Sequence, residues 1–434
     1  MYRQKVKQMT KSAPVTERPS VKEPEKPDKI SLDGGNDLLL FRCSGTELLK
    51  IDIVTRGGKI EQTRPLQAEF TALLLTGGTK SYSADTMAEM FDYYGTVPET
   101  GASLLTSSVS IMMMPEYLRD TGKLISEIIY HPVFPGNEID MHIKNEKQRF
   151  MVSRERVAAI SLDHFMESLF GPDHPWGKKV IPSHFDQVER EDLICFHRKY
   201  FRESPITVAL SGKVRDETIA VIEELFGTNS GSSYKAGNTR KDAVPAYERP
   251  APGKLFIGVK GARQDSINIG QRTIGPGNPD FIKLVIANTI LGGYFGSRLM
   301  QSLREKSGYT YGIHSLLVPA GSESIVAIMT EADIKYRERV VKGIYDEIEK
   351  MQREPVGGEE LEVARSYLLG SIAHRIDGPF NRSEAHLGSL FNGMGSDYYK
   401  RLISAIKAIT PDEIKRVISS YYILDNMHEI VAGG

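Results

Sequence analysis

The chain has 434 residues, of which 40% are hydrophobic and 26% charged, and these values are ordinary for a folded globular protein of two or three domains. Lysine and arginine number 55 against 56 acidic residues, so the net charge gives no electrostatic reason to expect nucleic acid or an anionic membrane as a partner. Only two cysteines occur, Cys43 and Cys195, which excludes a disulfide framework and a four-ligand zinc site built from cysteine alone.

Residues 1–30 are polar, contain four prolines and include no apolar core of the kind found in a secretory signal or a membrane span. This composition predicts a disordered tail. No later stretch has enough consecutive apolar residues to cross a bilayer. We therefore expect no membrane contact, and we expect the chain to be soluble and cytoplasmic.

Residues 31–228 are expected to form the first domain. The segment KIDIV, residues 50–54, alternates apolar and polar residues with period two, as a half-buried strand does. The stretch PLQAEFTALLLTGGTKSYSADTMAEMFDYYG, residues 65–95, predicts an amphipathic helix, a Gly-Gly turn and a second, capped helix that ends at a glycine. Its first helix contains neither histidine nor cysteine.

Residues 229–252 are rich in Gly, Ser, Asn and Pro, and this composition predicts a linker. Residues 253–434 then form the expected second domain. SESIVAIMT, residues 322–330, again alternates with period two. TPDEIKRVISSYY begins with a predicted N-cap at Thr410 and a proline at the first helical position.

The two domains carry matching landmarks at nearly constant separation. The offsets of 215 to 221 residues relate these pairs: Gly58 and Gly275, Gly78 and Gly293, Tyr200 and Tyr421, Gly212 and Gly433. Such regularity indicates a duplicated module. Because strands are grouped in hairpins with helices gathered on one face, we predict an α+β fold rather than a doubly wound parallel sheet.

Several segments are similar to one known family. ILGGYFGSRLMQSLREKSGYTYGIHS, residues 290–315, closely resembles the second-domain motif of the insulinase and mitochondrial processing peptidase family of zinc metallopeptidases. LFGPDHPWGKKVIPS and DLICFHRKYFRESPITVALSGKV also match, in the family's order. The resemblance implies two homologous α+β domains, each a mostly antiparallel sheet covered by helices, that face each other across a substrate chamber.

Active members of that family carry the inverted zinc motif H-x-x-E-H, in which two histidines bind the metal and the glutamate acts as the base. Counted from the Gly-Gly turn, these three positions fall on Glu69, Ala72 and Leu73. The family's third ligand, a later glutamate, falls near Arg149 and Phe150. These residues do not supply a tetrahedral zinc site, so we expect no metal in this chain.

Other acidic residues and histidines are further candidates for zinc ligands. Glu146 and Glu155 could recover one acid if the alignment shifts, but carboxylates without imidazole do not hold catalytic zinc. His164, His174 and His184 are spaced ten residues apart, which does not place them on one face of a helix. We interpret them as structural histidines.

The second half of the family's active site is present. In active relatives an arginine and a tyrosine seven residues later donate hydrogen bonds to the substrate carbonyl and its oxyanion, and here the motif implies Arg304 and Tyr311 in these roles. Without the resemblance, Arg304 would be interpreted as a solvated arginine or one paired with Glu305, and Tyr311 as sheet surface.

The sequence thus favours a non-zinc subunit of a heterodimeric peptidase, inactive alone, that acts on peptide or unfolded protein held at the zinc of a homologous partner. The alternative is a catalytically inactive scaffold or a peptide-binding subunit of the core type. A self-sufficient zinc protease is disfavoured by Ala72 and Leu73.

Overall fold

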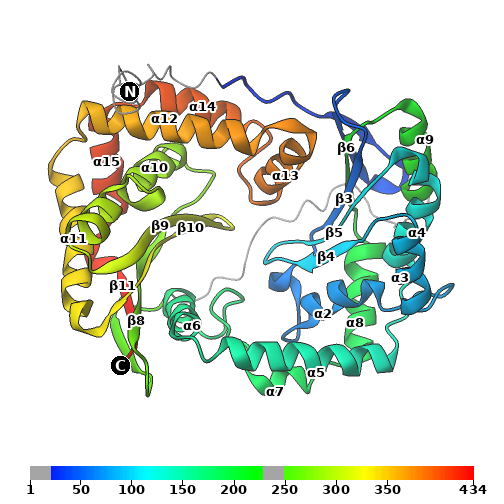
Figure 1. The fold of residues 1–434 in the computed structure, drawn as a ribbon, viewed down its shortest axis with the longest axis horizontal. Helices are drawn as coiled ribbons and strands as arrows, with labels where there is room; N and C mark the ends of the chain where they lie inside the picture. The colour runs from blue at the N-terminus through cyan, green and yellow to red at the C-terminus, as the bar shows by residue number, and fades with distance from the viewer. Residues whose placement is uncertain (1–20, 228–248) are drawn as a thin grey trace, which may run out of the picture.

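The computed structural model describes residues 21–227 and 249–434. Most of the predicted tail and linker falls on residues 1–20 and 228–248, outside the described residues. The first strand begins at Asp28, inside the final residues of the predicted tail. Figure 1 shows two halves side by side, each containing a sheet and its own helices. No helix in the described ranges combines the length and the apolar character that a membrane span requires.

The first half holds six strands and eight α-helices among the described residues. Its strands are β1 (Asp28–Ser31), β2 (Asp37–Arg42), β3 (Leu49–Thr55), β4 (Glu99–Ala102), β5 (Ser107–Met113) and β6 (Thr207–Gly212). Its helices are α2 (Gln67–Leu73), α3 (Ala84–Tyr93), α4 (Leu118–Tyr130), α5 (Gly136–Ser153), α6 (Val157–Phe170), α7 (Pro182–Phe185), α8 (Arg190–His197) and α9 (Asp216–Phe226).

The second half holds five strands and six α-helices among the described residues. Its strands are β7 (Lys254–Gly258), β8 (Gln264–Ile274), β9 (Thr310–Ala320), β10 (Glu323–Asp333) and β11 (His428–Gly433). Its helices are α10 (Phe281–Asn288), α11 (Arg337–Arg353), α12 (Gly358–Arg375), α13 (Gly378–Phe391), α14 (Tyr398–Ala408) and α15 (Pro411–Tyr421).

The two sheets have the same topology over five strands. Their orders are β1-β2-β6-β3-β5-β4 and β7-β11-β8-β10-β9. In each sheet one pair is parallel, β2 with β6 and β7 with β11, and the other pairs are antiparallel. The predicted α+β class with two homologous, mostly antiparallel domains is therefore confirmed.

Each sheet is covered on its second face by a helix from the opposite half. From the first half, α6 packs through Phe165 and Leu169 on β8, β10 and β11, and from the second half α13 packs through Leu387 on the sheet of the first half. Figure 1 shows α6 and α13 between the two halves. The sequence analysis expected helices on one face of each sheet only, and it did not predict the exchange of α6 and α13. A sheet with two apolar faces needs a covering layer on each.

We call α6 and α13 the crossing helices, because each packs on the sheet of the other half. A serine on each crossing helix makes a hydrogen bond to a central strand of that sheet. On α6, Ser161 accepts a bond from Asn268 Nδ2 at 2.6 Å, and on α13, Ser383 donates to Asp52 Oδ2 at 3.4 Å. The two strand residues are 216 positions apart and the two serines 222 apart. These offsets agree with the sequence landmarks, so the duplication extends to the contacts between halves.

A cation–π contact repeats in the same way at the last residue of each crossing helix. The guanidinium carbon of Arg272 lies 4.8 Å from the ring centroid of Phe170, and that of Arg56 lies 5.2 Å from the ring of Phe391. The arginines are again 216 positions apart, and the phenylalanines 221. Each crossing helix is thus held at two points along its length.

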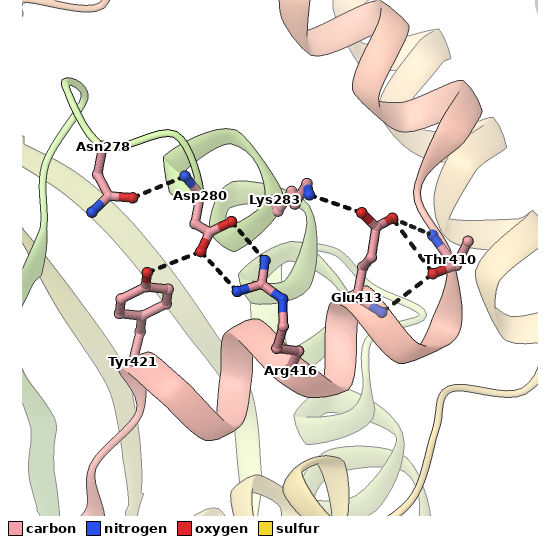
Figure 2. A network of polar contacts seen from close by, with 7 residues as sticks. All are labelled: Asn278, Asp280, Lys283, Thr410, Glu413, Arg416 and Tyr421. Carbon is pink, nitrogen blue, oxygen red and sulfur yellow. Dashed lines mark hydrogen bonds and ion pairs between the residues drawn. The ribbon is translucent and has the colours of Figure 1, made fainter.

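Helices α10 and α15 of the second half are joined by a network of ion pairs and hydrogen bonds (Figure 2). Arg416 donates to both oxygens of Asp280 at 2.6 and 2.9 Å, and the Tyr421 hydroxyl donates to the same carboxylate at 2.9 Å. In the first half, the counterpart Tyr200 donates to Glu61 at 2.8 Å. The aromatic landmarks of the repeat therefore share one function, which is to link a helix end to a nearby acid.

The start of α15 agrees with the sequence prediction. The Thr410 side chain accepts the Glu413 N–H at 3.3 Å, and Glu413 reaches back to the Thr410 N–H at 3.0 Å. Pro411 occupies the first turn. This reciprocal capping box satisfies N–H groups that a helix start leaves free.

The crossing of α6 makes the two halves interdependent in stability. Phe165 is fully buried against β8, where a side chain at Gly270 would meet its ring. Replacing Phe165 by Ala should lower the free energy of unfolding by about 3–5 kcal/mol. The control Leu162→Ala, on the same helix but exposed, should cost less than about 1 kcal/mol. Denaturant unfolding followed by circular dichroism and by fluorescence of Trp176 measures both; equal, small losses would contradict the packing argument.

The Asp280 network should add stability that depends on pH. The hydrogen bonds from Arg416 lower the pKa of Asp280 to about 2. Because the folded-state pKa is below the unfolded value, this stability is fully present above about pH 4 and is lost as pH falls toward 2. Solvent screening limits it to about 1 kcal/mol. Asp280→Asn should lower the free energy of unfolding by that amount at pH 7 and reduce the loss of stability between pH 4 and pH 2. Asp346→Asn, in an exposed pair with Lys342, should change neither. Denaturant unfolding at a series of pH values measures both.

Candidate active-site residues

The helix that resembles a zinc-site helix is α2, and its three motif positions are packed or paired. Glu69 forms an ion pair with Lys59, 2.8 Å between Oε1 and Nζ, and no described residue bonds its buried Oε2. Ala72 is fully buried and Leu73 is half-buried. The one carboxylate at these positions is thus neutralised by a lysine. At the position expected for the general base, Ala72 places a methyl group in the core.

The position of the third ligand, on α5, is equally unsuited to a metal. Arg149 is exposed and bonds to Glu146 at 2.6 Å. The neighbouring Phe150 packs its ring 5.3 Å from that of Phe185. Across the ranges that the structure describes, no three or more His, Cys, Asp or Glu side chains gather where they could hold a metal ion. The donor set at the family's zinc position does not fit tetrahedral zinc, which requires imidazole or thiolate in sufficient number.

The three evenly spaced histidines serve local structure. The His174 ring accepts the Trp176 N–H at 3.0 Å, and burial lowers the pKa of His174 to about 4. His164 contacts Lys179 Nζ at 2.8 Å, and His184 accepts the N–H of Ile181 at 3.3 Å. They lie in separate contacts, as the sequence interpretation expected, and the His174 bond shapes the GPDHPWG loop.

Arg304 and Tyr311 are brought together by the fold. Arg304 lies on the π-helical turn η7 (Met300–Lys306), and Tyr311 lies near the start of β9. The Arg304 guanidinium carbon is 5.8 Å from the centroid of the Tyr311 ring and 4.5 Å from that of Phe295. Tyr311 is 91% exposed. No carboxylate of the described residues, Glu305 included, forms an ion pair with Arg304, so its N–H donors are uncommitted.

The turn between η7 and β9 fixes the separation of these two residues. Gly308 adopts a left-handed backbone with φ of +64°, which glycine accepts without strain. Its N–H bonds to the Arg304 carbonyl at 3.1 Å, and the Tyr309 N–H bonds to the Leu303 carbonyl at 2.9 Å. This capping closes the helical turn and directs the chain into the strand that carries Tyr311.

The glycines that precede this motif hold it against the sheet. A side chain at Gly292 would lie 2.6 Å from the Cβ of Ser315 on β9, so only glycine allows this approach. Ser315 bonds to Asn288 at 2.5 and 2.9 Å, and the Tyr422 hydroxyl donates to Asn288 at 2.6 Å. All of these groups are buried. Sequence reasoning missed Asn288 and Tyr422, because their partners are distant in the chain.

Sequence reasoning also missed Phe295, the ring nearest to the Arg304 guanidinium. It lies inside the motif that was recognised, between the glycines and η7, and is 60% exposed. An exposed aromatic residue beside a Gly-Gly pair was the available signal.

Comparison with known proteins gives a consistent result. Residues 187–368 match the family model described as the peptidase M16 inactive domain. An uncharacterized zinc protease of Mycobacterium tuberculosis is 26% identical over 258 residues, which cover 59% of this chain and 58% of that relative. An uncharacterized zinc protease of Rickettsia bellii is 23% identical over 400 residues, which cover 91% of this chain and 92% of the relative.

Solved structures share the fold along most of the chain. An M16 inactive domain from Pseudomonas fluorescens superposes with a TM-score of 0.82 at 20% identity, covering 94% of this chain and 98% of that one. The periplasmic protease PqqL of Escherichia coli has a TM-score of 0.78 at 16% identity and covers 98% of this chain, which spans 47% of PqqL.

The isolated chain should bind no stoichiometric zinc, since Glu69 is paired and the two other motif positions lack donors. Metal analysis of chelator-washed protein tests this, and one tightly held zinc per chain would contradict it.

The variant Ala72→Glu should lower the free energy of unfolding by about 2–4 kcal/mol, because it places a carboxylate at a fully buried position. Glu69→His, at a partly exposed position, is the milder comparison.

The family match covers the part of the chain in which the structure brings Arg304 and Tyr311 together. The matched model spans the end of the first half and much of the second, including Arg304 and Tyr311. The zinc proteases of Mycobacterium, Bacillus and Rickettsia match this chain, and the chain covers just over half the length of the mycobacterial relatives. The chain is therefore similar to the M16 inactive domain over residues 187–368 and to uncharacterized zinc proteases over more of its length, and the sequence prediction assigns Glu69, Ala72 and Leu73 to the H-x-x-E-H positions.

Proposed function

We propose that this chain is the non-zinc subunit of a heterodimeric M16 peptidase and contributes Arg304 and Tyr311 to peptide held on a partner subunit. The partner is a homologue with an intact H-x-x-E-H motif, and the substrate is a peptide or an unfolded protein. When bound there, zinc would supply the activated water for peptide hydrolysis. The part of this chain is to bind and orient the peptide and to stabilise charge on its carbonyl oxygen.

One observation carries the proposal: the positions expected to hold zinc do not supply its ligands, while Arg304 and Tyr311 lie together without a polar partner among the described residues. Tyr311 is exposed and Arg304 is half-buried. A structural arginine is normally committed to a carboxylate, as Arg298 is to Glu360 at 2.7 and 2.9 Å. An uncommitted guanidinium beside an exposed phenol is suited to an external acceptor. Both groups are fixed donors that can stabilise a developing oxyanion.

The strand that carries Tyr311 also presents apolar side chains that are suited to a peptide. On β9, the edge strand of its sheet, Leu316 and Val318 are exposed. They lie opposite Ala327 and Ile325 of β10 in register, so both pairs share one face of the sheet. Exposed apolar side chains on the strand that carries Tyr311 match the apolar part of a peptide chain. The same side chains are suited to a partner subunit, since exposed apolar surface favours association.

Replacement of the two donors separates an active-site role from a scaffold. In the pair reconstituted with a zinc-bearing homologue, Arg304→Ala or Tyr311→Phe should reduce kcat by roughly 10²–10³, about 3–4 kcal/mol of transition-state stabilisation. KM should change less, because the interaction strengthens as charge develops. Arg304→Lys should not rescue fully, since an ammonium lacks the planar fork. Steady-state cleavage of a quenched fluorogenic peptide measures these effects.

Three controls accompany this experiment. Zinc content and assembly of each pair, by metal analysis and size-exclusion chromatography, should match those of the wild type. Arg339→Ala, which removes a nearby guanidinium that lies 5.9 Å from the ring of Tyr309, should leave kcat unchanged. Near-normal turnover in Arg304→Ala with an intact complex would instead assign this chain to the scaffold class.

A further inference from the structure

The Arg304 guanidinium lies close to two exposed aromatic side chains. Its central carbon is 4.5 Å from the Phe295 ring centroid and 5.8 Å from that of Tyr311, and Phe295 is the nearer ring. Both distances are within the range of cation–π attraction. The guanidinium is thus in contact with aromatic rings, and none of its N–H donors is taken up by a carboxylate of the described residues.

We propose that Phe295 is a positioning residue: its ring holds the Arg304 guanidinium in place while leaving every N–H of that group available to the peptide. The inference rests on the proposed function, because it concerns the same donor. A carboxylate would hold the arginine more strongly, but it would occupy the donors that the substrate needs and would neutralise the charge. An aromatic face avoids both effects.

A second arginine in the chain shows the contrasting arrangement. The Arg337 guanidinium carbon lies 4.2 Å from the ring of Phe256, also an exposed phenylalanine. There, however, Arg337 donates to both oxygens of Asp265 at 2.7 and 3.0 Å. The carboxylate positions that guanidinium, and the ring only covers it. Among the residues described here, Arg304 has ring contacts alone, so Phe295 is the group that can restrain it.

The loop that carries Phe295 is held by contacts of its neighbouring residues. The preceding residue, Tyr294, stacks on Tyr367 of α12 with ring centroids 4.7 Å apart, and its backbone is extended. The Ser297 N–H then bonds to the Tyr294 carbonyl at 3.1 Å, which closes a tight turn around Phe295. Thus one aromatic residue anchors the loop to the helical layer, and the next one presents its ring to Arg304.

Substitutions of Phe295 in the reconstituted pair test this inference. Phe295→Leu keeps an apolar side chain but removes the aromatic face, and it should lower kcat/KM for the fluorogenic peptide about three- to tenfold, mainly through kcat. Phe295→Tyr keeps the face and should restore turnover to within about twofold of the wild type. Phe256→Leu, at the contact where Asp265 holds the arginine, is the matched control and should have no effect.

A double-mutant cycle distinguishes positioning from a general structural effect. If Phe295 acts through Arg304, then Phe295→Leu should cause no further loss in an Arg304→Ala background. Equal losses in both backgrounds, or a normal kcat/KM in Phe295→Leu while Arg304→Ala is impaired, would overturn the role of Phe295 and leave the proposed function intact. Normal turnover in Arg304→Ala would overturn both.

Discussion

The exchange of one helix between the two halves is the constraint on which the rest of the structure depends. Each sheet packs its own helices on one face only, and an uncovered apolar face would be exposed to water. The crossing helices α6 and α13 supply the missing layers, with Phe165 fully buried on the opposite sheet. Because each half completes the core of the other, the relative position of the halves is fixed by packing, and with it the position of every site residue.

The duplicated module has kept its structural contacts and changed its chemistry. The strand-to-helix hydrogen bonds Asn268–Ser161 and Asp52–Ser383 recur at corresponding positions. By contrast, α2 in the first half has no histidine at the positions where the resemblance predicts zinc ligands, while its counterpart α10 in the second half ends in the buried bonds next to the Arg304 motif. Burial explains the difference: core contacts are costly to change in either half, whereas a catalytic site can be lost without loss of the fold.

The arginines of this chain show how the surroundings decide what a guanidinium can do. Arg298 and Arg337 are held by carboxylates, which raise the pKa of each above its usual value and commit the donors. Arg272 contacts both a ring and Glu323. Arg304 is half-buried beside Tyr311, and within residues 21–227 and 249–434 its side chain contacts rings rather than carboxylates. Charge and donors that form no contact inside the protein remain available to a ligand, and this is the physical reason for proposing a role for Arg304 rather than for the paired arginines.

The sequence by itself determined the features that depend on local pattern: the two α+β modules and their offset, the helix start at Thr410, and the absence of zinc ligands at Ala72 and Leu73. The resemblance to a known family also placed Arg304 and Tyr311 in one motif. Only the tertiary structure decided which sheet each crossing helix covers and that the Phe295 ring lies against the guanidinium. Periodicity reports that a helix has an apolar face, but the partner of that face is set by packing between residues far apart in the chain.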